Sequence, residues 1–154
     1  MTGRQALSKR SAPKGRARSA ERVVSDRQLL DRASGARAQA YAPYSKYYVG
    51  AAVVTADGSI YTGANVENAS YGLSLCAERV AIHKAVSEGH RAIDTVAVVT
   101  DDGAPPCGAC RQVMAEFGVR RVVVGPPRGR GRVRTLKQLL PDAFTPERLL
   151  KKRS

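Results

Sequence analysis

Apolar residues recur at the spacing of amphipathic helices in four parts of the chain. After Ser25, a residue type that caps helix N-termini, leucine and alanine return every three to four positions. This first helix is expected to end before Pro43, because the residue that precedes a proline avoids the helical conformation. Apolar patterning predicts three more helices, at residues 75–86, 107–117 and 136–140.

β-Branched residues dominate the stretches between these helices, which predicts strands. Asp57-Gly58 is a strong hairpin signal, so the strands on either side of it are expected to pair antiparallel. Arginines at alternate positions from 128 to 134 predict a surface loop that enters a short strand. Strands that alternate with helices predict an α/β fold in which helices cover a mixed sheet. The predicted strands are 49–55, 60–63, 94–100 and 120–125, and residues 64–74 are expected to form a polar loop.

Positive charge is concentrated at the two ends of the chain. The 154 residues carry a formal net charge of +13, to which residues 1–25 contribute +6 and residues 146–154 contribute +3. Residues 1–24 hold one leucine and no aromatic side chain, so we expect a disordered basic arm. Such an arm attracts nucleic acid only non-specifically, if it has a partner at all. Residues 25–145 are expected to form one folded domain, and 146–154 a basic tail.

Hydropathy and cysteine content exclude several classes of protein. No run of 18 apolar residues exists, so no membrane-spanning helix is expected. The N-terminus lacks the apolar stretch of a secretory signal. The three cysteines are odd in number and cannot form a fully paired disulfide framework. We therefore expect a protein of the reducing cytoplasm.

The cysteines lie at the starts of two predicted helices. Cys107 and Cys110 are one turn apart and share a helix face, and Cys76 begins the other helix. Helix N-termini lower thiol pKa values, so two converging termini would hold three thiolates well. A redox pair of Cys107 and Cys110 leaves Cys76 without a role. A structural zinc site needs a fourth ligand, whereas a catalytic zinc site has three protein ligands and a place for water.

The absence of a fourth ligand favours the catalytic interpretation. His83 lies two turns beyond Cys76, roughly 10 Å along the helix axis, and is expected to be a packed or surface side chain. His90 is expected in a loop. Glu78 lies within an apolar helix, where a carboxylate is costly unless it has a partner. That partner is either a surface cation such as Arg79 or a water molecule at the metal.

Five sequence motifs follow one another within residues 26–145. They are 44–52 (YSKYYVGAA), 65–71 (NVENASY), 75–79 (LCAER), 106–110 (PCGAC) and 139–144 (LLPDAF). Together they resemble the short, homotetrameric, all-cysteine type of cytidine deaminase, and the resemblance leaves out both basic ends. It implies a three-layer αβα sandwich with a mixed sheet of about five strands flanked by helices. It also implies hydrolytic deamination of cytidine and 2′-deoxycytidine to uridine and 2′-deoxyuridine, with release of ammonia, as in pyrimidine salvage.

The resemblance implies one zinc ion per chain, held by Cys76, Cys107 and Cys110. Glu78 is then the proton shuttle that serves the attacking water, the pyrimidine N3 and the departing amine. Three thiolates outweigh the charge of Zn²⁺. Arg79, which stands where the family's arginine bonds the ligand sulfurs, is the residue expected to offset this excess.

The resemblance also implies substrate contacts. Asn65 and Glu67 stand where the family contacts the ribose, although without the resemblance they are ordinary hydrogen-bonding loop residues. Tyr47 stands where the family commonly stacks phenylalanine on the pyrimidine, and Tyr48 stands where it usually has proline. The backbone of Ala77 is expected to read the base edge. Two more aromatic residues match positions that reach sites across subunit contacts, although lone aromatics also serve simple packing: Tyr71 and Phe144.

The sequence leaves two other functions open. One is deamination of another aminopyrimidine nucleoside, such as a blasticidin-type antibiotic, although the loop at 65–71 favours ordinary ribose. The other is a polynucleotide-binding deaminase, which only the basic arm supports.

Overall fold

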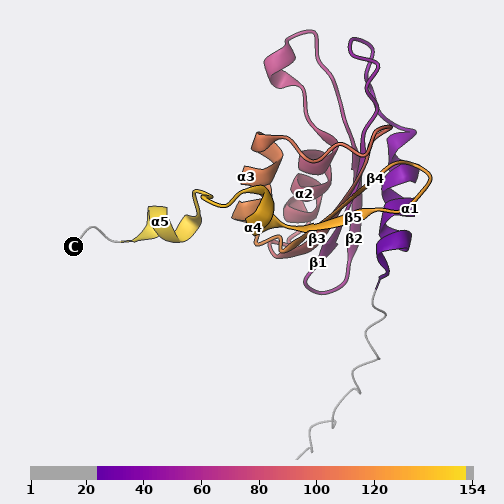
Figure 1. Cartoon of the computed structure of the whole chain (residues 1–154). Helices are drawn as coiled ribbons and strands as arrows, with labels where there is room; N and C mark the ends of the chain where they lie inside the picture. Colours follow the sequence, from indigo (N-terminus) through magenta and orange to yellow (C-terminus); the bar gives the residue numbers. More distant parts are fainter. Residues whose placement is uncertain (1–23, 152–154) are drawn as a thin grey trace, which may run out of the picture.

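The computed structural model describes residues 24–151, whose strands form one mixed sheet (Figure 1). The strand order is β2-β1-β3-β4-β5. Only β3 and β4 run parallel, and the other neighbours are antiparallel. The predicted mixed sheet and the short strand after the arginine-rich loop are therefore confirmed. The strands are β1 (Gly50–Thr55), β2 (Ile60–Ala64), β3 (Ile93–Val99), β4 (Arg121–Gly125) and β5 (Arg132–Thr135).

Helices cover both faces of the sheet and make a three-layer αβα sandwich, as predicted (Figure 1). One face packs against α1 (Asp26–Arg37). The other packs against α2 (Ala77–Ser87), α3 (Gly108–Glu116) and α4 (Leu136–Leu139). No helix among residues 24–151 is long and apolar enough to cross a membrane.

Alternation along the strands explains the two layers of core. In β3, Val96 and Val98 point to the α2 and α3 side, while Ala97 and Val99 point to α1. Successive side chains of a strand face opposite sides of the sheet, so an almost continuous apolar strand fills both interfaces. The strand that carries this pattern ends at the loop 100–106, which leads into α3.

The ends of the helices follow local chemistry, and the largest difference from the predicted helix ranges is at the start of α2. Ser25 caps α1 through a reciprocal pair of hydrogen bonds with Gln28. Helix α2 was predicted from residue 75 but begins at Ala77. The reason is tertiary: Leu75 exchanges two backbone hydrogen bonds of 2.9 Å with Val66, so its backbone is extended.

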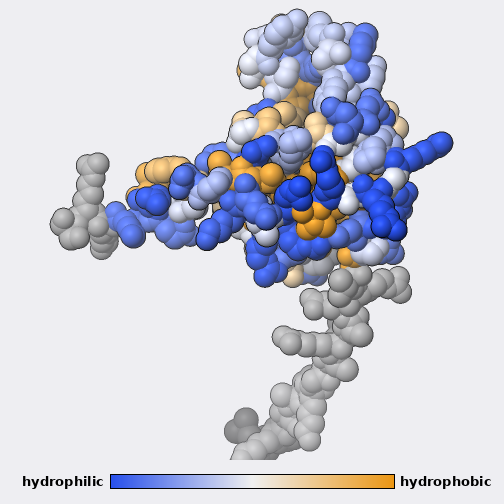
Figure 2. Space-filling model, viewed as in Figure 1, coloured by the Kyte–Doolittle hydropathy of each residue, from blue (hydrophilic) through white to orange (hydrophobic). Residues whose placement is uncertain are grey.

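Both ends of the chain differ in part from the charge-based boundaries. The predicted basic arm lies outside the described residues except for Val24, which is partly buried against the α1 side of the core. At the other end, the sequence predicts a basic tail but no helix, whereas Pro146–Leu150 form α5. This short helix stands away from the sandwich (Figure 1). Its exposed leucines give it the apolar surface visible in Figure 2.

Gly63 in β2 sets how closely the first turn of α2 approaches the sheet. A Cβ atom at this position would lie 2.6 Å from the Ala77 carbonyl oxygen and 2.6 Å from the Ala81 amide nitrogen. We expect Gly63→Ala to lower the free energy of unfolding by about 1–3 kcal/mol, as overpacked cores do. Thermal unfolding measures this, with Gly35→Ala as control, since nothing lies within 4 Å of a Cβ at that helical position. A Gly63→Ala protein that melts no lower than the control variant would contradict the prediction.

Candidate metal centre and substrate cleft

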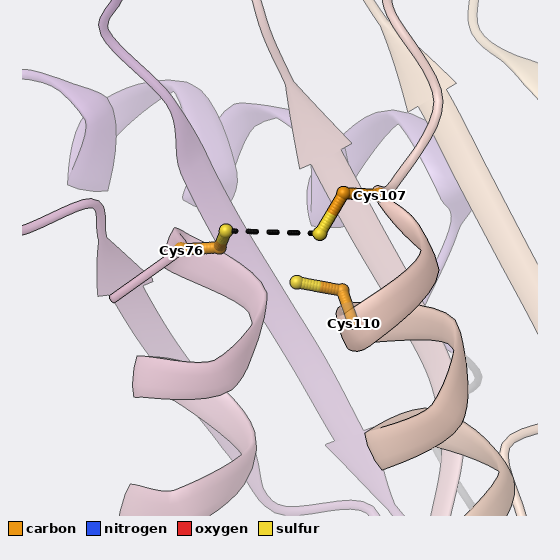
Figure 3. A group of neighbouring side chains, drawn as sticks. All are labelled: Cys76, Cys107 and Cys110. Carbon is orange, nitrogen blue, oxygen red and sulfur yellow. Dashed lines mark hydrogen bonds between the residues drawn. The ribbon is translucent and has the colours of Figure 1, made fainter. Parts of the chain in front are cut away.

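Two helix N-termini bring three sulfur atoms together (Figure 3). Cys76 is the N-cap of α2 and Cys107 is the N-cap of α3, and the two helices lie side by side on one face of the sheet. Neither N-cap thiol bonds its own helix, so both side chains are free to point toward each other. Cys110 reaches the same place from the first turn of α3. The three Sγ atoms all lie within 4.8 Å of one another.

The spacing of the Cys76 and Cys107 sulfurs fits a tetrahedral zinc site. Zn–S bonds of about 2.3 Å place two sulfurs of a tetrahedron about 3.8 Å apart. The Sγ atoms of Cys76 and Cys107 are 3.9 Å apart. That separation is far too long for a disulfide, and all three cysteines are free. Cys76 stands beside Cys107 and Cys110 as a third sulfur, which favours a metal site over a redox pair that those two cysteines would form alone.

No fourth protein ligand joins the three sulfurs within residues 24–151. His83 is exposed on the surface of α2, and His90 lies after α2, where its Nδ1 is 3.1 Å from a carboxylate oxygen of Asp57. Both histidines are thus where the sequence predicts them, away from the cluster. Three sulfur donors without a fourth protein group suit a zinc ion that keeps one position for a small ligand.

The cluster stabilises the thiolate form of Cys76. The pKa of Cys76 is lowered to about 5, chiefly because the Cys110 thiol donates a hydrogen bond to it, with Arg79 acting in the same direction. Cys110 is the donor of that bond and is buried, so its own pKa is raised. Arg79 donates from Nη2 to the Ser74 carbonyl oxygen at 3.1 Å and to Cys76 Sγ at 3.7 Å. A divalent cation would replace the protons that the sulfurs still share.

Glu78 lies next to this cluster and is almost completely buried, at 4 % exposure. Burial raises its pKa to about 7, and the negative charge of Cys76 adds to that rise. It forms no ion pair with any residue in 24–151, which argues against the surface contact considered from sequence. A carboxyl group with this pKa can both take up and release a proton near neutral pH.

A cleft of about 250 Å³ opens above Glu78. Tyr47, Asn65 and Glu67 line it together with Glu78 and with two of the three cysteines, Cys76 and Cys107. The cleft lies where β1 begins and β3 ends, since Val49 and Val98 also face it. A space of this size and lining can accept a planar heterocycle with a small polar group attached.

Hydrogen bonds hold the two predicted ribose contacts in place. The side-chain oxygen Oδ1 of Asn65 accepts a hydrogen bond from the backbone amide of Val49 at 2.8 Å. The side-chain nitrogen Nδ2 of Asn65 donates to the Tyr47 carbonyl oxygen at 2.8 Å. Glu67 accepts from the Tyr44 amide at 2.9 Å and from both the amide and the hydroxyl of Ser45. The Ser45 hydroxyl is the main reason that the pKa of Glu67 is lowered. Both side chains keep further hydrogen-bonding capacity toward the cleft.

The chain is similar to known proteins over most of its length. Residues 23–126 match the family described as "Cytidine and deoxycytidylate deaminase zinc-binding region". The chain belongs to this family. A cytidine deaminase of Halalkalibacterium halodurans is 53% identical over 127 residues, which cover 79% of this chain and 96% of the relative. One from Mycobacterium tuberculosis is 45% identical over 118 residues, or 75% of this chain and 86% of the relative.

A solved structure agrees with this family membership. The crystal structure of cytidine deaminase from Burkholderia pseudomallei is 48% identical to this chain and superposes with a TM-score of 0.74. The match covers 78% of this chain and 99% of that one. The deaminase fold therefore accounts for the sandwich, and the family's zinc-binding region includes all three cysteines.

Three residues that the family resemblance assigns to substrate do not line the cleft of a single chain. Ala77 is buried in the first turn of α2. Tyr71 is 74 % exposed and lines a neighbouring hollow with Tyr44. Phe144 is 58 % exposed, and its carbonyl oxygen accepts from Gln112 Nε2 at 2.6 Å. One chain thus leaves Tyr71 and Phe144 pointing to solvent.

Several residues around the cleft of this deaminase were not identified from sequence. Thr100 and Ala104 line it, and Asp102 bonds its lining residue Tyr47. The available signal was position: Thr100 to Asp102 directly follow a buried strand, at the sheet end where ligands commonly bind in α/β folds. Nothing in the sequence of the 44–52 motif indicates that Tyr47 contacts the loop after β3.

Proposed function

We propose that this protein catalyses the zinc-dependent hydrolytic deamination of cytidine and 2′-deoxycytidine to uridine and 2′-deoxyuridine, with release of ammonia. The observation that carries the proposal is a buried carboxylate, Glu78, beside a three-sulfur cluster at the floor of a cleft. Membership of the deaminase family supports the same reaction.

The residues of the chain supply proton transfer and charge balance. When bound, zinc lowers the pKa of a coordinated water to about 7 and so supplies a hydroxide nucleophile at neutral pH. Glu78 accepts a proton from the attacking water and delivers it to the pyrimidine N3. It then takes the remaining proton from the hydroxyl added at C4 and passes it to the amino group, so that C4=O forms as the C4–N bond breaks and ammonia leaves. One water enters and one ammonia leaves, so cytidine becomes uridine. A pKa of about 7 suits a carboxyl group that must work in both directions.

Arg79 balances the charge of the metal centre in this proposal. Three thiolates and one Zn²⁺ sum to −1, which weakens the cation as a Lewis acid. The guanidinium of Arg79 donates to Cys76 Sγ and restores the missing positive charge. The substrate is held by Tyr47 at the pyrimidine and by Asn65 and Glu67 at the ribose, all of which face the cleft.

We propose further that the chain assembles as a homotetramer in the reducing cytoplasm. Large apolar side chains are exposed on the elements around the cleft, where neighbouring chains would cover them: Tyr44, Tyr71, Leu73 and Phe144. A neighbouring chain is also the way in which Tyr71 and Phe144 would contribute to a site that they do not reach in one chain. Ala77 lies between Cys76 and Glu78 and is fully buried, so its backbone would act within its own chain. Light scattering on the zinc-loaded protein should give four times the chain mass of 16.5 kDa. The mass of a single chain would contradict the assembly.

A substrate panel tests the proposed reaction. Purified, zinc-loaded protein is incubated with cytidine, 2′-deoxycytidine, blasticidin S and a cytosine-containing single-stranded oligonucleotide, and ammonia release is followed. We expect turnover of the two nucleosides. Turnover of blasticidin S alone would show that the substrate is an antibiotic of this type and not cytidine. Turnover of the oligonucleotide alone would support a polynucleotide deaminase. No turnover of any of them would remove the proposal.

A further inference from the structure

The hydroxyl of Tyr47 has a fixed partner across the mouth of the cleft. It donates a hydrogen bond of 2.9 Å to Asp102 Oδ1, although the two residues are 55 positions apart. Tyr47 precedes β1, and Asp102 lies in the loop between β3 and α3. Hydrogen bonds to a carboxylate are stronger than those between neutral groups. The ring is therefore tethered at the end farthest from the backbone.

Groups other than Tyr47 also hold the Asp102 carboxylate in place. Its Oδ1 also accepts from the Thr100 hydroxyl at 3.0 Å and from the Ala104 amide at 3.2 Å. The Ala104 amide shares its proton with the Thr100 hydroxyl oxygen at 2.7 Å, and Gly103 takes a φ of 65°, which closes the turn. The hydrogen bond from Tyr47 is the main reason that the pKa of Asp102 is lowered, so the carboxylate stays ionised at neutral pH.

The backbone of Tyr47 is fixed as firmly as its hydroxyl. Its amide donates to the Ser45 hydroxyl oxygen at 3.0 Å, and its carbonyl oxygen accepts from Asn65 Nδ2 at 2.8 Å. The same junction carries a second link, because Arg37 donates to the Tyr48 carbonyl oxygen at 2.8 Å and pairs with Asp101. Two neighbouring links thus join the two sides of the cleft mouth. Tyr47 bonds Asp102 directly, and Arg37 connects Tyr48 to Asp101.

We propose that Asp102 is a positioning residue of the deaminase site, which holds the Tyr47 ring in the orientation that receives the pyrimidine and joins the loops 44–49 and 100–106 across the mouth. This inference rests on the proposed function. Phenylalanine at position 47 would keep the ring face but lose the tether. A ring held in place serves the bound substrate and the transition state alike, so the tether acts on KM more than on kcat.

A double-mutant cycle on the zinc-loaded protein tests the tether. We expect Asp102→Ala to raise KM for cytidine about tenfold with kcat within about twofold of the starting protein. Asp102→Asn keeps an acceptor for the hydroxyl and should recover most of that loss. In the Tyr47→Phe background, Asp102→Ala should add little, because the hydroxyl that it serves is gone. The control Asp31→Ala removes an exposed, ion-paired carboxylate on α1 and should leave KM unchanged.

A full tenfold effect of Asp102→Ala in the Tyr47→Phe background would overturn the proposal, because Asp102 would then act through its own loop alone. Hydrogen exchange gives a readout that does not depend on turnover. Tyr47→Phe should speed exchange at the amides of residues 100–104, and unchanged exchange there would overturn the proposal as well. Failure of the starting protein to deaminate cytidine would instead count against the proposed function.

Discussion

Replacing Glu78 with glutamine is expected to remove almost all turnover while the protein still binds zinc. Glutamine matches the size of glutamate but cannot carry a proton. Positioned acid–base groups contribute up to about 10⁴-fold, and Glu78 serves several proton transfers in the proposed reaction, so a loss of kcat near 10⁴-fold is expected. The three sulfurs are untouched by the change, so zinc should stay at one ion per chain.

The same substitution should stabilise the metal-free protein as pH rises. The pKa of Glu78 is raised from 4.5 to about 7 in the folded chain, so ionising it favours unfolding between those two values. Glutamine has no charge to bury. The metal-free Glu78→Gln protein should therefore gain stability over the starting protein as pH increases from 4.5 to 7, by on the order of 3 kcal/mol.

Steady-state kinetics, zinc content and urea unfolding at several pH values measure these effects. Glu116→Gln is a suitable control, because Glu116 is an exposed carboxylate on α3. It should change neither turnover nor the dependence of stability on pH. A Glu78→Gln protein with near-normal turnover would remove Glu78 from the proposed chemistry, whatever its stability.

The metal centre was predictable because its sequence signals are local. Cys76 and Cys107 each precede an apolar helix, so sequence alone places both thiols at helix N-termini. The hairpin at Asp57-Gly58 and the β-branched runs likewise predict the strands through short-range conformational preferences. No local signal predicts that α2 and α3 pack side by side. This packing follows because both helices cover the same face of the sheet.

The rim of the cleft was less predictable because its contacts join distant segments. The start of α2 depends on the pairing of Leu75 with Val66, and no local pattern at residue 75 reveals it. The bond from Tyr47 to Asp102 requires the register of β1 against β3, which places the two loops at one end of the sheet. For Tyr71 and Phe144 the relevant neighbour lies outside a single chain altogether in the proposed tetramer.

The second large effect is expected for Cys107→Ala, which should lose zinc and melt at a lower temperature. Removing one of three sulfurs leaves two donors, too few for a stable zinc site. Because zinc binds the folded chain, its binding free energy adds to stability, and we expect the melting temperature to fall by about 10 °C or more. Cys107 suits this experiment better than Cys110, since it is exposed, and truncating the buried Cys110 would also open a cavity.

A chelator separates loss of the metal from loss of packing. The Cys107 side chain makes no capping hydrogen bond to α3, so its removal should cost the metal-free helix little. The melting temperatures of Cys107→Ala and of the starting protein should therefore differ widely with zinc and nearly coincide after chelation. Zinc content by mass spectrometry completes the measurement. An undiminished difference in chelator would mean that Cys107 stabilises the fold by packing. One zinc per chain in Cys107→Ala would mean that Cys107 is not a zinc ligand. Either result would contradict the three-sulfur zinc site.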